Sequence, residues 1–185
     1  MQQLITIVFP QPAQNLHSIF RATPEPAFFP EPRKSLDSEK VLTHLGSQMS
    51  DLVAYVDGGS WGNPGPAGIG VIINSSDGGQ IRIAKWIGFQ DNNVAEYVAL
   101  LEALQCALAR KARSLRVYSD SDVVVRQMCG EYACRSPRLY SLNWICRKLA
   151  RDLEFSIARI PREDNAEANH LANSAARLFR KAGDN

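Results

Sequence analysis

Apolar and polar residues alternate with a period of two in the first part of the chain that follows residue 50. Residues 52–59, LVAYVDGG, read as a strand that ends in a glycine turn. Residues 67–88 alternate on both sides of a polar, glycine-rich segment at 77–79, which is typical of a β-hairpin. This part of the chain is therefore expected to form three antiparallel strands.

Beyond the hairpin, the period changes to that of a helix. Residues 94–112 place apolar side chains on one stripe about four turns long, and Asn92 and Asn93 are candidates to cap it. The remaining segments predict a strand at 114–120, helices at 122–130 and 138–151, a strand at 153–161 and an alanine-rich helix at 166–181. This order predicts an α/β fold with a five-stranded mixed sheet, three strands antiparallel and two parallel, flanked by helices.

Residues 1–50 have a different composition and hold six of the ten prolines. Proline lacks an amide donor and disfavours a helical residue before it, so regular core structure is not expected there. We expect a flexible leader with a short helix at 36–49; the alternative is a partner-docking motif around Phe28 and Phe29. Residues 51–181 form the predicted domain, and 182–185 a C-terminal tail.

Composition excludes several protein classes. The 45% hydrophobic and 22% charged residues are ordinary for a globular protein, and no apolar run approaches the roughly 18 residues of a membrane helix. The N-terminus lacks the features of a secretory signal. Four cysteines and three histidines show no zinc-finger spacing, which favours free thiols in a reducing cytoplasm. A net charge of +2 does not decide the partner.

Three carboxylates stand where predicted elements meet. Asp57 ends the first strand before two glycines, Glu96 falls in the first turn of the long helix, and Asp120 lies between a strand and a helix. Each has a structural explanation by itself, as a turn residue, a partner of the helix dipole or a cap. Taken together, they would converge on one edge of the sheet. Because clustered carboxylates repel unless a cation neutralises them, the set predicts a divalent metal site.

Four segments resemble ribonuclease H type 1 in their order and spacing. They are YVDGGSWGNPGPAGIGVII at 55–73, NNVAEYVALLEAL at 92–104, VYSDSDVVVRQMCGEY at 117–132 and IPREDNAEANHLANSAARL at 160–178. The resemblance covers about residues 51–181 and is to the compact prokaryotic form, which lacks a basic handle helix. It implies a ribonuclease H-like fold and two Mg²⁺ ions, replaceable by Mn²⁺, that cleave the RNA strand of an RNA–DNA hybrid.

The resemblance assigns metal ligation and catalysis to Asp57, Glu96 and Asp120. The fourth position of the acidic set, where the family usually has Asp, is Asn169 here. An asparagine still offers an amide oxygen but contributes no charge, so metal binding is expected to weaken. Four nearby acids are alternatives that would compensate for the missing charge: Asp122, Glu163, Asp164 and Glu167. Of these, Asp122 replaces a usual Gln and is expected to point away from Asp120.

Other positions match the family's contacts with its substrate. The resemblance implies that the first turn tracks the RNA backbone through backbone amides, and RNA-specific contacts typically involve the 2′-OH. It also implies base-edge contacts from the Asn pair and a phosphate-steering role for Arg162, which stays protonated and so is not a general base. Asp91 replaces a usual Thr and is expected to weaken a DNA-phosphate contact. The expected substrate-binding residues are Gly58, Gly59, Ser60, Gly62, Asn63, Asn92, Asn93 and Arg162.

The spacing of the aromatic residues and of the last histidine predicts which of them are buried and which are exposed. Trp86, Trp144 and Phe155 fit core positions of strands or helices, whereas Trp61 is expected to be exposed on the substrate side. His170 is turned by about 100° from Asn169 along a helix, so we expect it at the surface.

Two classes of function remain open at this point. One is an endonuclease that hydrolyses the RNA strand of hybrids and leaves 5′-phosphate ends. The other is a hybrid-binding module that lost catalysis through Asn169. Three retained acids favour the enzyme, while another nuclease or resolvase of the same broad fold is disfavoured by the GNPG and NNVAEY segments. We expect a cytoplasmic monomer with no membrane association and no obligate protein partner.

Overall fold

The computed structural model describes residues 50–182, with side chains described up to Arg177. The predictions for the leader, residues 1–50, and for the tail, residues 182–185, fall outside these described residues apart from Ser50 and Ala182. They therefore stay predictions.

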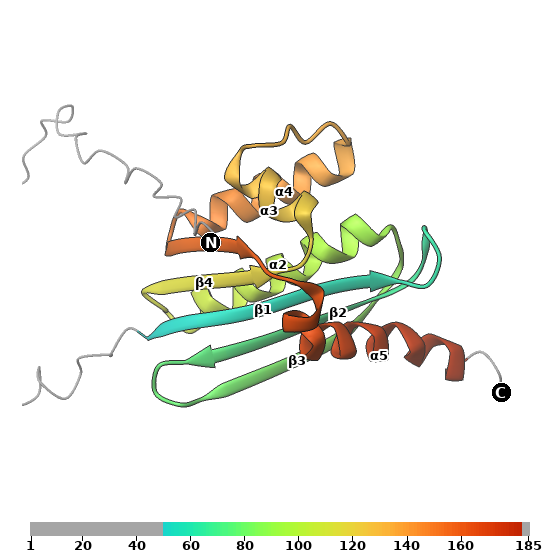
Figure 1. The fold of residues 1–185 in the computed structure, drawn as a ribbon, viewed down its shortest axis with the longest axis horizontal. Helices are drawn as coiled ribbons and strands as arrows, with labels where there is room; N and C mark the ends of the chain where they lie inside the picture. The colour runs from blue at the N-terminus through green and yellow to red at the C-terminus, as the bar shows by residue number, and fades with distance from the viewer. Residues whose placement is uncertain (1–49, 183–185) are drawn as a thin grey trace, which may run out of the picture. The chain divides into compact units, whose positions relative to one another are not determined.

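The described chain forms one five-stranded sheet with helices on both faces (Figure 1). The strand order is β3-β2-β1-β4-β5, with β1, β2 and β3 antiparallel and with β1, β4 and β5 parallel. This confirms the predicted fold class. The elements are β1 Asp51–Ser60, β2 Gly65–Ser75, β3 Gln80–Gln90, α2 Asn92–Ala109, β4 Ser114–Ser119, α3 Asp122–Cys129, α4 Pro137–Ala150, β5 Glu154–Arg159, the 3-10 helix η1 Arg162–Asn165 and α5 Ala166–Ala182.

Helices α2 and α5 pack on opposite faces of the central strands (Figure 1). Two glycines allow this close packing. A Cβ on Gly58 would lie 2.1 Å from the carbonyl carbon of Ala95 in α2, and one on Gly70 would lie 2.0 Å from the carbonyl oxygen of Ala168 in α5. In the β1–β2 register, Gly70 is opposite Asp57. The N-terminal parts of both helices are therefore held against the same part of β1.

The N-terminus and buried face of α2 differ from the prediction. Asn92 and Asn93 are the first two helical residues, and Asp91 is the N-cap. Of the expected apolar stripe, Val98, Leu101 and Leu108 are only half-buried. Because α2 lies between the sheet and α4, small side chains also face inward and allow close approach. The buried apolar residues of α2 are Val94, Ala95, Tyr97, Ala99, Leu100, Ala103, Leu104 and Ala107.

Two of the three predicted core aromatics are exposed. Phe155 is buried in β5 as expected, but Trp86 is 45% exposed and Trp144 is 54% exposed. Trp86 lies on β3, the edge strand of the sheet, where most side chains are at least half-exposed. Trp144 lies on the outer side of α4, with the Lys148 ammonium 5.2 Å from its ring centroid. Spacing alone did not identify which faces these elements expose.

Substitution of the adjacent glycines of β1 tests the close approach of α2. Gly58→Ala is expected to lower the free energy of unfolding by about 1–3 kcal/mol, because its methyl group overlaps the α2 backbone. Gly59→Ala is the matched control, since the nearest atom to its Cβ is 3.9 Å away, and it should change stability by less than about 0.5 kcal/mol. Urea unfolding measures both. Equal losses in the two variants would contradict this account of the packing.

Candidate active site

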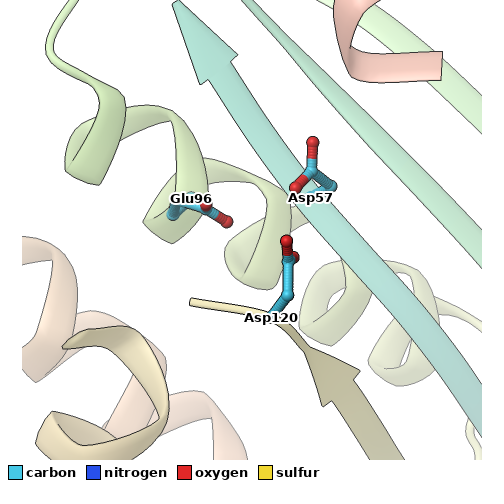
Figure 2. A group of neighbouring side chains, drawn as sticks. All are labelled: Asp57, Glu96 and Asp120. Carbon is cyan, nitrogen blue, oxygen red and sulfur yellow. The ribbon is translucent and has the colours of Figure 1, made fainter. Parts of the chain in front are cut away.

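Three carboxylates from separate elements meet at one point of the fold (Figure 2). One oxygen from each of Asp57, Glu96 and Asp120 lies within 4.8 Å of the other two. Asp57 and Glu96 are only 3% and 7% exposed, and Asp120 is half-buried. The structure thus confirms that the sequence brings these three acids together. We call them the acidic cluster.

The local positions of two of these acids differ from the prediction. Asp57 does not end its strand, because β1 continues to Ser60. Glu96 is the fifth residue of α2, beyond a first turn that contains no acid, so a favourable position at the helix dipole does not explain it. Its carboxylate instead accepts a hydrogen bond of 3.2 Å from the amide of Gly58.

Parallel pairing explains why the third acid is nearby. Strands β1 and β4 run in parallel, so their C-terminal ends lie at the same edge of the sheet, and Asp120 follows β4 directly. Ser121, and not Asp120, is the N-cap of α3, because its hydroxyl accepts a hydrogen bond from the amide of Val124. Asp120 is therefore not needed as a cap, and its carboxylate faces the cluster (Figure 2).

Burial and mutual repulsion oppose ionisation of the cluster. Burial first, and then the charge of Asp120, raise the pKa of Asp57 from its ordinary value of 3.8 to about 7. Burial, and then the charges of Asp57 and Asp120, raise the pKa of Glu96 well above its ordinary value. The Arg162 guanidinium acts in the opposite direction on both pKa values. The site therefore favours an added positive charge, in the form of protons or a metal ion.

The structure adds Asn165, which the sequence analysis did not single out. This side chain is 1% exposed, and its amide nitrogen donates to the carbonyl of Val56 at 2.9 Å and to a carboxylate oxygen of Asp120 at 2.8 Å. Asn165 thereby fixes Asp120 relative to β1. The only available signal was its position inside the last of the four motifs, one helical turn before Asn169.

Asn169 adjoins the cluster, as expected. Its amide nitrogen donates to Asp57 at 3.3 Å, while its amide oxygen accepts a hydrogen bond of 2.9 Å from the side chain of Asn173. The NH₂ group rather than the oxygen thus faces the carboxylate. For Asn169 to ligate a metal, the amide would have to rotate and lose this bond from Asn173.

The four acids considered as substitutes lie elsewhere. Asp122 pairs with Arg126 at 2.9 Å and with Arg159 at 3.7 Å, and Glu167 pairs with Arg82. Glu163 and Asp164 are exposed residues of η1. Within residues 50–182, the group of acidic, histidine or cysteine side chains close enough to share a metal contains Asp57, Glu96 and Asp120 and none of these four.

The glycine turn and the asparagine pair interact with each other. The Ser60 amide donates to the side-chain oxygen of Asn92 at 3.3 Å, and the Asn92 amide donates to the side-chain oxygen of Asn63 at 3.1 Å. The amides of Gly58 and Ser60 are therefore used inside the protein, which differs from the expectation that they face phosphate. Gly62 has the positive φ of 87° that the turn requires.

The remaining predicted residues lie at the surface around this turn. Asn93, Arg162 and His170 are exposed, the last as predicted, and Trp61 is 43% exposed. Asp91 forms an ion pair of 3.3 Å with Arg138, which partly neutralises the negative charge at this position.

Comparison with known proteins identifies the family of this chain. Residues 55–175 match a family model described as reverse transcriptase-like. The ribonuclease HI of Halobacterium salinarum is 38% identical over 66% of this chain and 62% of its own length. The crystal structure of RNase H1 from this archaeon is 37% identical, has a TM-score of 0.64 and is covered over 96% of its chain. The chain belongs to the ribonuclease H type 1 family.

Other ribonuclease H structures extend the comparison. LC11-RNase H1, crystallised with an RNA/DNA hybrid, is 35% identical with a TM-score of 0.65, over 70% of this chain and 99% of its own. The N-terminal RNase H domain of Rv2228c from Mycobacterium tuberculosis is 37% identical with a TM-score of 0.64, over 68% and 98% of the two chains. The whole bifunctional Rv2228c protein is matched over 35% of its length. The similarity is therefore at the level of the ribonuclease H domain.

Among the helices between residues 50 and 182, none combines the length and the apolar composition needed to cross a bilayer.

Removing one charge from the ribonuclease H cluster should stabilise the metal-free protein. When unfolded, Asp57 ionises near pH 3.8, but when folded it ionises only near pH 7. The folded state therefore binds more protons between these values and loses stability as the pH rises through them. Asp57→Asn removes this loss, so its melting temperature should exceed that of the wild type by roughly 5 °C at pH 8 and by less at pH 5.

Thermal melting in EDTA from pH 5 to 8 measures this difference. The pKa of Glu96 also falls in the variant, because the charge of Asp57 no longer raises it, and this adds to the difference in the same direction. A difference in melting temperature that stays constant over this range would show that Asp57 does not carry the predicted pKa shift.

Proposed function

We propose that this chain is an endoribonuclease that hydrolyses the RNA strand of RNA–DNA hybrids and leaves 5′-phosphate ends. The observation that carries the proposal is the acidic cluster, buried at the junction of β1, α2 and β4 in a ribonuclease H type 1 domain. A relative of similar sequence, LC11-RNase H1, was crystallised with an RNA/DNA hybrid, which supports a hybrid as the partner.

The donor set fits Mg²⁺, with Mn²⁺ as a substitute. Mg²⁺ prefers hard oxygen ligands, and Asp57, Glu96 and Asp120 supply them from three fixed directions. Burial and mutual repulsion raise the pKa values of Asp57 and Glu96 despite the opposing charge of Arg162, which supports a cation as the neutralising partner. In this proposal, two bound ions supply positive charge to the scissile phosphate and lower the pKa of an attacking water.

The protein's own residues then have distinct roles. Asp57, Glu96 and Asp120 hold the cations, with Asn169 beside them as the fourth member of the catalytic set. Asn165 keeps the Asp120 carboxylate in place through its hydrogen bond of 2.8 Å. Arg162 adds positive charge close to Asp57 and thus near the reacting phosphate, where it attracts the backbone of the substrate.

RNA recognition is assigned to the turn at Gly59, Ser60 and Gly62. Asn63 and Asn92, which connect this turn to α2 by hydrogen bonds, belong to the same surface. The side-chain oxygens of Asn63 and Asn92 accept the two hydrogen bonds that connect the turn to α2. Among the described residues, their NH₂ groups have no partner. Two fixed donors of this kind suit the acceptors that an RNA minor groove offers, which are 2′-hydroxyl oxygens and base edges. Asn93 extends the same surface.

The second candidate is a hybrid-binding module with weakened catalysis. The orientation of Asn169 favours it, because the NH₂ group donates to Asp57 and occupies an acceptor that a cation would need. Both candidates share a fold and a partner, so only a reaction distinguishes them.

The cellular setting follows from the same proposal. We propose a cytoplasmic monomer that acts without an obligate protein partner. Cys106, Cys129, Cys134 and Cys146 are free thiols, in agreement with a reducing compartment.

Cleavage of an end-labelled hybrid tests the function directly. The wild type should cut the RNA strand with Mg²⁺ or Mn²⁺, leave 5′-phosphate ends, and spare duplex RNA, duplex DNA and the DNA strand of the hybrid. Asp120→Asn is the control and should lose at least about a hundredfold in rate, because it removes a ligand charge. A wild type that binds the hybrid but cuts it with neither metal would support the binding module instead.

The side chain at position 169 is expected to determine the Mg²⁺ concentration that activity requires. Asn169→Asp should lower the Mg²⁺ concentration for half-maximal activity by about tenfold, since ligand charge tightens cation binding, and should slightly destabilise the metal-free protein. Asn169→Ala should require more Mg²⁺ than the wild type because the ligand is lost. A magnesium titration of activity compares the three. If alanine and asparagine give the same curve, Asn169 is not a ligand.

A further inference from the structure

A polar groove leads away from the acidic cluster along α5. Asn169, Asn173 and Arg177 are spaced by four residues and so share one side of this helix. Together with Arg162, His170 and Ser174, they line a hollow of about 640 Å³. We call this the α5 groove. The hollow has a polar lining and is largely open to solvent.

The near end of the groove adjoins the reacting centre. The amide of Asn169 contacts Asp57 at 3.3 Å, and Asn173 donates both to the side-chain oxygen and to the carbonyl of Asn169 at 2.9 Å. Asn173 also lies beside Gly59, whose Cβ position is 3.9 Å from the Asn173 side-chain oxygen. The groove thus begins at the cluster and follows the end of β1.

The far end carries a positive charge held in a fixed position. The Arg177 guanidinium lies 5.0 Å from the ring centroid of Trp61, which belongs to the turn after β1. Arg82, Arg126 and Arg138 form ion pairs with acids. Arg177, by contrast, has no carboxylate within 4 Å among the described residues. Stacking on Trp61 orients the guanidinium without neutralising it.

The charges along the groove match a nucleic-acid backbone. Arg162 and Arg177 stand at its two ends, and Glu163 is the one acid among the described residues that line it. Eight residues of helix separate Asn169 from Arg177, or about 12 Å. Neighbouring phosphates of one strand lie farther apart than the rise of about 3.4 Å for each nucleotide along the duplex axis, so this length reaches over only a few nucleotides.

We infer that the α5 groove binds the phosphate backbone of the strand that is cut, with Arg177 on a phosphate a few nucleotides from the scissile one. This rests on the proposed function and extends it, because it makes the length of hybrid beyond the cleavage site a determinant of affinity. Trp61 positions Arg177, and Asn173 lines the path between Arg177 and the cluster.

The test compares Arg177→Ala with the wild type on hybrids of graded length. On a long hybrid, the KM of the variant should rise by roughly five- to tenfold with little change in kcat, and the slope of log KM against log salt should fall by about one. Arg116→Ala, which removes an exposed arginine of β4 outside the groove, is the matched control and should leave KM unchanged. Thermal melting verifies that both variants fold.

Strand-specific truncation then locates the contact. If the RNA strand ends within two nucleotides of the cleavage site on the side that the groove binds, the wild type and Arg177→Ala should have the same KM. Shortening the DNA strand alone should preserve their difference. If the difference in KM between the two proteins is the same on all lengths, Arg177 has a structural role through Trp61. If the difference in KM is lost when the DNA strand is shortened, the contact is with the DNA strand. Either result overturns the inference.

The failure of this inference can be told apart from failure of the proposed function. A wild type that does not cut the hybrid contradicts the proposed function itself. Normal cleavage by the wild type, with an unchanged KM and salt dependence in Arg177→Ala, overturns only the assignment of the α5 groove.

Discussion

Repulsion between three close carboxylates is the constraint on which this structure depends. Two unit charges about 5 Å apart interact by roughly 3 kcal/mol at an effective dielectric constant near 20, and the cluster contains three such pairs when fully ionised. Burial of Asp57 and Glu96 adds the cost of desolvation. A folded chain keeps such a group only if the rest of the structure holds it, and the natural counterpart of the cluster is a cation.

The fold holds the cluster by bringing backbones unusually close together. Gly58 and Gly70 let α2 and α5 approach β1 and β2 on opposite faces, at distances that a Cβ would not permit. The amide of Gly58 then donates to Glu96, while η1 presents Asn165 to Asp120 and α5 presents Asn169 to Asp57. The same glycines that pack the helices thus determine the positions of the ligands. Stability and chemistry are coupled at this point of the sheet.

The order of strand and helix segments along the chain was sufficient to predict a mixed sheet of three antiparallel and two parallel strands, because hairpins give antiparallel pairs and helical crossovers give parallel ones. The convergence of the three acids was also predicted, although only Asp120 stands where its strand ends, whereas Asp57 lies inside β1 and Glu96 beyond the first turn of α2. The exposure of Trp86 and Trp144 was not, because it depends on which element covers a given face. The role of Asn165 likewise depends on a contact between residues 45 positions apart, which no local pattern encodes.

The charge distribution of the site changes sign over a short distance. The acidic cluster favours cations, whereas Arg162 near it and Arg177 farther along α5 carry the positive charge that the proposed function assigns to phosphate. This juxtaposition is what hydrolysis of a polyanion by bound metal ions requires, because the site must hold the cations and the substrate together. The hydrogen bonds of Asn63 and Asn92 between the turn and α2 hold the NH₂ groups of both side chains in place as donors. The three features together distinguish this site from an acidic patch.

The central claim is that the cluster is a cation site that requires its charges, and calorimetric titration of Mg²⁺ tests it most directly. The experiment uses wild type and Glu96→Gln at pH 6.5 in two buffers of different protonation enthalpy. The account predicts saturable binding by the wild type with release of protons, because a cation favours the ionised carboxylates. Glu96→Gln should bind at least about tenfold more weakly. Equal affinity in the two proteins would contradict the account.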